Sequence, residues 1–235
     1  MLRLYDTRHR LVEPLLPSGS RSLRMYTRGP DLRTHLLTDL IRRVLERSSV
    51  RVAAQQSPAD DESSLRADTL ALNMRPVDHQ PLPARPIDLL VGSSSDEVEA
   101  THRADCGRFA FDGKLGDVVS AGLDPLSVRL ALMEHHYRTD LTLTWDALRA
   151  ADQTIRHWRG QVAEWAESLS APIAKTYQDA LTEAFEDDLD TPRALKLFRD
   201  LAEDPGVSPG ARFETAMHAD HILALDLAID IGKPR

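Results

Sequence analysis

The second half of the chain carries the spacing of amphipathic helices. From Leu126 to Met133 an apolar residue recurs every three or four positions, which places the apolar side chains on one face of a helix. A longer apolar stripe runs from Trp145 towards Leu169 and follows Thr144, a residue type that caps helix N-termini. We therefore expect a short helix and then a long one in this region.

Three further helices are expected towards the C-terminus. Pro172 stands where a first helical turn accepts proline, Asp190 followed by Thr191-Pro192 is a helix start signal, and residues 213–231 have helical spacing. Short loops between successive helices favour a bundle. Residues 123–235 are therefore expected to form an all-α helical bundle domain.

The first half alternates short apolar runs with helical spacing, and residues 1–122 are expected to form an α/β domain around a short parallel sheet. The chain as a whole should be mostly helical. The expected elements are strands at 23–28, 50–54 and 87–91, helices at 32–46 and 65–74, an extended proline-rich connector at 76–86 and a helix that begins near Asp96.

Composition points to a globular protein with an uneven charge. The 235 residues are 42% hydrophobic and carry a net charge of −8, which disfavours diffuse binding to polyanions. Residues 1–51 contain 11 arginines and 5 acidic residues, whereas residues 52–235 contain 18 basic and 32 acidic residues. The basic segment suits an acidic partner, a phosphate-bearing ligand or the acidic remainder of the same chain.

One cysteine, no apolar run of membrane-spanning length and a start without a signal-peptide pattern predict a cytoplasmic protein that makes no membrane contact.

Candidate chemistry is sparse. The stretch from Gly92 to Ser95 follows an expected strand and offers N–H groups and hydroxyls to an anion, although a plain loop with a serine cap is favoured. His135 and His136 are adjacent, so on a helix they point apart and cannot easily share one metal ion. Cys106 has no evident catalytic partner. We expect no metal site from these residues.

Several segments, in order, resemble cysteinyl-tRNA synthetases and, more closely, the related mycothiol-pathway ligase that joins cysteine to a glucosaminyl-inositol. The clearest are residues 124–138 (DPLSVRLALMEHHYR), with Trp145 shortly after, and residues 187–195 (DDLDTPRAL). The resemblance implies a class I synthetase fold of Rossmann type, truncated here, followed by the helical bundle.

This chain departs from the family pattern at its signature motifs. Arg28 stands where the family has a zinc-binding cysteine before Gly29-Pro30, so the resemblance implies that the zinc site is lost. The His-x-Gly-His element is absent and leaves His35 as a remnant, and a single Lys114 replaces the Lys-Met-Ser-Lys-Ser loop. These two elements stabilise the α-phosphate during adenylation in the family.

The departures favour a catalytically degenerate relative that needs no cofactor. Such a protein would act by binding a partner protein in a thiol or specialised metabolic pathway, or by forming a homo-oligomer. Its ligand-binding positions, at the carboxyl ends of the expected strands, would be Arg28, Gly29, Ser93, Ser94 and Ser95.

Two other interpretations remain open. The first is a divergent ATP-dependent ligase that forms an aminoacyl-adenylate with cysteine or another amino acid, using His35, Lys114 and the serine loop. The second is a tRNA-binding module, which the net charge disfavours; its candidate residues are Arg24, Arg28, Arg33, Arg42, Arg43 and Arg47.

Overall fold

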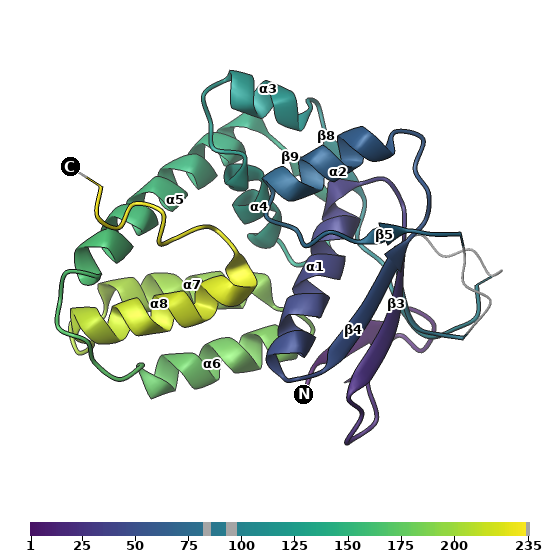
Figure 1. The fold of residues 1–235 in the computed structure, drawn as a ribbon, viewed down its shortest axis with the longest axis horizontal. Helices are drawn as coiled ribbons and strands as arrows, with labels where there is room; N and C mark the ends of the chain where they lie inside the picture. The colour runs from purple at the N-terminus through teal and green to yellow at the C-terminus, as the bar shows by residue number, and fades with distance from the viewer. Residues whose placement is uncertain (82–85, 93–97, 234–235) are drawn as a thin grey trace. The chain divides into compact units, whose positions relative to one another are not determined.

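The computed structural model describes residues 1–81, 86–92 and 98–233 (Figure 1). The chain forms two compact units. The sheet unit comprises Met1–Phe111, His136–Thr142 and Glu186–Leu189, and the helical unit comprises Asp112–His135, Leu143–Phe185 and Asp190–Arg235. Each unit therefore combines segments that are distant in the sequence.

The sheet unit is built on a five-stranded parallel sheet with strand order β5-β4-β3-β6-β7. The strands are β3 (Ser22–Arg28), β4 (Arg51–Gln56), β5 (Asp78–His79), β6 (Ile87–Gly92) and β7 (Ala100–Ala104). The expected Rossmann-like parallel sheet is thus confirmed. The expectation of three strands is wrong, because β5 and β7 extend the sheet at both edges.

The two extra strands lack a strand pattern in the sequence. β5 is two residues long and lies within the proline-rich stretch that we expected to be a connector. β7 has the sequence ATHRA, with polar residues at its centre. We expected a helix that begins near Asp96. Residues 93–97 lie outside the described residues, and from Val98 the chain leads into β7 without a helix, so this expectation is wrong for the described part.

Helix α1 (Leu32–Arg47) packs against one face of this sheet, beside β3 and β4 in Figure 1. Alternate residues of β3, namely Leu23, Met25 and Thr27, are buried towards it, and Thr27 Oγ1 lies 2.7 Å from Thr38 Oγ1 of α1. Helix α2 (Glu62–Ala71) contacts α1. It begins and ends three residues before the helix expected at 65–74, because Asp61 caps its N-terminus.

Two short strand pairs were not expected. Strands β1 (Arg3–Asp6) and β2 (Leu11–Pro14) form a hairpin, which is tied to β7 by a 2.9 Å hydrogen bond from Thr7 N to the Arg103 carbonyl oxygen. Strands β8 (Phe109–Phe111) and β9 (Leu141–Leu143) pair in the second. All four strands are three or four residues long, too short for periodicity to reveal.

The helical unit confirms most of the expected bundle. Its helices are α3 (Leu115–Ser120), α4 (Leu126–Met133), α5 (Trp145–Trp165), α6 (Lys175–Glu186, whose last residue belongs to the sheet unit), α7 (Thr191–Glu203) and α8 (Pro209–Leu223). Thr144 caps α5 and Asp190 caps α7, as their side chains predict. Pro172 lies before α6 rather than in its first turn.

The last helix ends eight residues before the position expected from spacing. Arg129 is fully buried and donates to the carbonyl oxygens of Leu223 at 2.6 Å and Ile222 at 3.2 Å, and Ala224 adopts a left-handed conformation. These contacts satisfy the helix end that a longer helix would have continued. Among the described residues, no helix combines the length and apolar composition that a membrane crossing requires.

Candidate functional site

The strand order places a switch point between β3 and β6. The chain runs outwards from β3 through β4 to β5 on one side and returns through β6 to β7 on the other. Sheets of this kind bind ligands outside the carboxyl ends of the strands at such a point. Arg28 and Gly92, which end β3 and β6, are paired in register there, next to Gly29 and the N-terminus of α1.

Gly92 brings the backbone of β6 unusually close to that of β3. Its φ is +98°, and a Cβ atom added to it would lie 2.0 Å from the Arg28 carbonyl oxygen and 2.9 Å from Thr34 Cγ2. No side chain other than hydrogen fits this position. The space beside Gly92 in the direction of a side chain is therefore filled by the backbone of Arg28 and the side chain of Thr34.

The N-terminus of α1 is occupied by a carboxylate of the chain itself. Asp31 Oδ1 accepts a 2.9 Å hydrogen bond from Thr34 N, and its Oδ2 accepts a 2.6 Å bond from Thr34 Oγ1. This capping contact uses an N–H group that a phosphate would need, and it adds a negative charge beside it. An anion is disfavoured at this helix end.

His35, the expected remnant of the adenylation motif, has a structural role. Its side chain is buried, and Nε2 donates to the Gly29 carbonyl oxygen at 3.0 Å. Burial lowers the pKa of His35, although Asp31 and the Gly29 carbonyl oppose this effect. The ring is therefore neutral at pH 7 and supplies no cation to a phosphate.

The other predicted ligand positions belong to different parts of the chain. Lys114 belongs to the helical unit, where it is the N-cap residue of α3. Ser93, Ser94 and Ser95 lie outside the described residues. Arg28 and Gly29 do flank the switch point.

Arg33 was proposed as a nucleic-acid contact, yet it is one of the largest fully buried side chains. Its guanidinium donates to the carbonyl oxygens of Thr139 at 2.5 Å and His136 at 2.8 Å. It holds the segment around residues 136–139 against α1, and it cannot reach a phosphate backbone.

Other arginines of the basic segment also form internal contacts. Arg43 pairs with Asp39 at 2.8 Å, and Arg42 pairs with Glu46 at 2.8 Å. These contacts neutralise part of the positive charge that the sequence places at residues 1–51.

Cys106 follows β7 and lies near the N-terminus of α1. Burial, with a smaller contribution from the nearby Asp31 carboxylate, raises the pKa of its thiol to about 12. The side chain is therefore protonated at neutral pH. It lacks the thiolate that a nucleophile requires.

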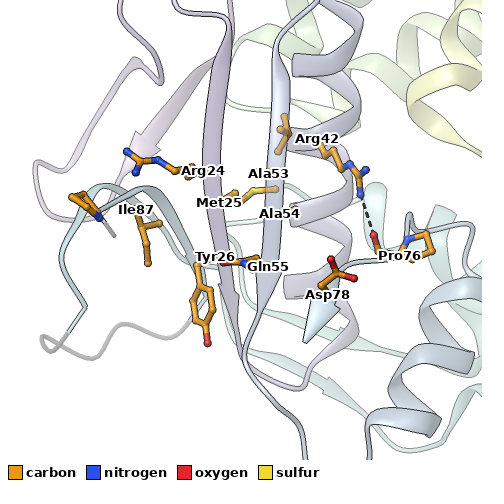
Figure 2. Close-up of a pocket in the computed structure, with 12 residues that line it drawn as sticks. Arg24, Met25, Tyr26, Arg42, Ala53, Ala54, Gln55, Pro76, Asp78 and Ile87 are labelled. Carbon is orange, nitrogen blue, oxygen red and sulfur yellow. Dashed lines mark hydrogen bonds between the residues drawn. The ribbon is translucent and has the colours of Figure 1, made fainter. Parts of the chain in front are cut away.

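A cavity of about 490 Å³ lies along β3 and β4. Figure 2 shows Arg24, Tyr26 and Ile87 on one side of these strands and Arg42, bonded to the Pro76 carbonyl oxygen at 3.1 Å, on the other. Its volume is in the range of small-molecule sites. No motif in the sequence marks this cavity, although the alternation of polar and apolar residues along β3 marks a face that α1 does not cover.

The two stretches that carried the family resemblance meet in the sheet unit around Asp188. Its Oδ1 accepts from Tyr137 Oη at 2.6 Å and from Tyr5 N at 2.8 Å, and Arg138 lies 2.7 Å from Oδ2. Burial raises the pKa of Tyr137, and the Asp188 carboxylate adds to this effect. Tyr137 therefore serves as a hydrogen-bond donor, and the cluster joins three distant segments of the chain.

Curated relatives of the chain are ligases. The ligase of Kribbella flavida named L-cysteine:1D-myo-inositol 2-amino-2-deoxy-alpha-D-glucopyranoside ligase is 37% identical over 107 residues, which are 46% of this chain and 25% of the ligase. The matched part of the chain is related to this ligase family. The resemblance inferred from the motifs is thereby confirmed.

Ligases of the same name from two other organisms match in a similar way. That of Acidothermus cellulolyticus is 34% identical over 48% of this chain and 27% of its own length, and that of Geodermatophilus obscurus is 41% identical over 41% and 21%. The matches thus span about a quarter of these ligases. No family model matches the chain.

Proposed function

We propose that this chain is a noncatalytic relative of the cysteine ligases that acts by binding. The observation that carries the proposal is the close approach of β3, β6 and α1, where Gly92 leaves no space for a Cβ atom. Adenylation depends on cations and N–H dipoles aimed at the phosphate in the transition state. At this edge Asp31 occupies the helix N-terminus and His35 is neutral.

The partner that we propose is a protein with an acidic surface, in a thiol or specialised metabolic pathway. At the amino end of the sheet face that α1 leaves uncovered, Arg51 and Ala53 are exposed, and the exposed Arg24 pairs with Asp88 at 3.2 Å. Small exposed residues between cations allow a partner to approach the backbone closely, and the charge would steer an acidic surface to it.

The absence of adenylation is tested by pyrophosphate exchange. The purified chain is assayed with ATP and L-cysteine beside a full-length ligase, and ATP binding is measured by calorimetry. We expect no exchange above background and no heat of binding at millimolar ATP. Exchange that requires L-cysteine would overturn the proposal and favour the second candidate, a divergent ATP-dependent ligase.

The binding role is tested by affinity capture from the native organism followed by mass spectrometry. The variants Arg51→Glu and Ala53→Glu alter the exposed sheet face, whereas Arg149→Glu changes an exposed arginine of α5. A genuine partner should be lost with the first two variants and kept with the third. Equal capture by all three variants would place the contact elsewhere and contradict the proposed face.

A further inference from the structure

Four metal-ligating side chains converge where the N-terminal hairpin meets the edge strand of the sheet. Asp6 ends β1, His9 lies in the turn that follows, Glu13 belongs to β2 and His102 is the central residue of β7. The first three offer ligand atoms that all lie within 4.8 Å of one another. The cluster lies entirely within the sheet unit and does not overlap the carboxyl edge described above.

A fourth side chain, His102, approaches two of these three ligands. His102 Nδ1 lies 3.4 Å from Asp6 Oδ2 and 3.5 Å from Glu13 Oε1. His9 Nδ1 lies 3.8 Å from the same Asp6 oxygen and 2.8 Å from the same Glu13 oxygen. Two imidazole nitrogens thus face two carboxylate oxygens.

The four histidine–carboxylate separations lie near the ligand spacing of a tetrahedral ion. Zinc binds histidine nitrogen and carboxylate oxygen at about 2.0 to 2.2 Å, so neighbouring ligands of a tetrahedral site lie about 3.4 Å apart. The four distances extend to either side of that value. Apart from the 2.8 Å contact between His9 and Glu13, they are too long for strong hydrogen bonds.

A second observation points to a cation independently of the cluster. The Asp6 side chain is fully buried, and its Oδ2, which faces both histidines, has no hydrogen-bond partner. Its Oδ1 accepts from the N–H groups of Arg8 at 2.8 Å and His9 at 3.4 Å. A buried carboxylate oxygen without a donor is unusual, and a metal ion would satisfy it.

Charge also suits a divalent ion. Two carboxylates would neutralise a divalent ion. Arg8 is the nearby competing cation: its Nη2 lies 3.6 Å from Asp6 Oδ2 and also donates to the Thr101 carbonyl oxygen.

We propose that Asp6, His9, Glu13 and His102 form a zinc site that ties the N-terminal hairpin to β7. Two nitrogen and two oxygen ligands from the protein fill a tetrahedral shell, which is typical of a structural site rather than a catalytic one. The site is separate from the zinc site of the resembled family, whose position is taken by Arg28. It does not depend on the proposed function.

The site is tested by zinc competition titration with a chromophoric chelator, using the full chain without an affinity tag after removal of metal. We expect one zinc ion per chain and a rise of Tm on zinc addition. His9→Gln and His102→Gln should each weaken zinc binding at least tenfold. Asp6 is left unchanged because its Oδ1 also holds the turn.

The matched control is His157→Gln, which replaces an exposed histidine of α5 in the helical unit. It should bind zinc as the wild type does. Cobalt added in place of zinc should give the strong visible absorption of a four-coordinate ion in the wild type and the control. Far-UV circular dichroism of the metal-free proteins checks that the variants fold.

Two results would overturn the proposal. One is a wild-type chain that takes up no zinc at micromolar concentrations. The other is zinc binding that is equally tight in the wild type, His9→Gln and His102→Gln, which would place the ion elsewhere.

Discussion

Replacing Gly92 by alanine tests whether the switch point is closed. The added methyl group would lie 2.0 Å from the carbonyl oxygen of Arg28, so the backbone of β3 or β6 must move. Gly19 provides a matched control in the same unit. Its φ of +85° is close to the +98° of Gly92, but an added Cβ atom would have nothing within 4 Å.

The comparison separates two costs. Both variants place alanine at positive φ, which costs about 1 to 2 kcal/mol, and both reduce the entropy of the unfolded chain by a similar amount. Only Gly92→Ala adds the steric conflict, for which overpacking costs about 1 to 3 kcal/mol. The free energy of unfolding should therefore fall further in Gly92→Ala than in Gly19→Ala by about 1 to 3 kcal/mol.

The measurement has to report on the sheet unit. All three tryptophans, Trp145, Trp158 and Trp165, lie in the helical unit, so their fluorescence follows that unit. Urea unfolding is better followed by far-UV circular dichroism, together with hydrogen exchange of peptides from β3 and β6. Faster exchange in these two strands is expected for Gly92→Ala.

Equal destabilisation by the two alanine substitutions would refute this reasoning. It would mean that the ends of β3 and β6 have room for a side chain. The crevice would then be open to a ligand, and the main observation behind the noncatalytic proposal would be lost.

Three further predictions concern buried groups of the sheet unit. Arg33→Met should lower the free energy of unfolding by about 2 to 5 kcal/mol because it leaves buried carbonyl oxygens without donors. Arg51→Met, at an exposed position, should change it by no more than about 0.5 kcal/mol in the same urea titration, and a similar loss in both variants would contradict the role of Arg33. Cys106, whose pKa is raised to about 12, should react slowly with a thiol reagent at pH 8 in the native protein and fully in denaturant; rapid native labelling would show that the thiol is accessible. Burial lowers the pKa of His35 below 6.5, so the unfolded chain binds more protons than the folded one between these two pKa values. The free energy of unfolding should therefore fall as pH falls through 6.5 towards the lower folded pKa of His35. His35→Gln should remove this part of the pH dependence. The same pH dependence in the wild type and the variant would contradict the prediction.

Local signals predicted the helices well and the sheet in part. Thr144 and Asp190 marked helix starts correctly, because an N-cap acts on N–H groups two or three residues away. The strand at 87–91 was evident from its continuous apolar run, which suits a strand buried on both faces. β5 was hidden, since two residues carry no periodicity and only pairing with β4 defines the strand.

The candidate site, like the sheet, could be predicted from the sequence only in part. The sequence pointed to Arg28 and Gly29, and the register of β3 and β6 does place them at the switch point. It also suggested His35 as a catalytic remnant and Arg33 as a surface cation. Both side chains are buried, since they lie in the first turn of a helix that packs against other segments.

The sequence alone determined the alternation of strands and helices in the first half, the bundle in the second and the relation to a ligase family. These follow from local periodicity, helix caps and the order of motifs along the chain. The tertiary structure decided that Gly92 closes the gap between two strand ends and that His102 faces Asp6 across 96 positions of the chain. Such contacts depend on how distant segments pack, and no spacing within the sequence encodes them.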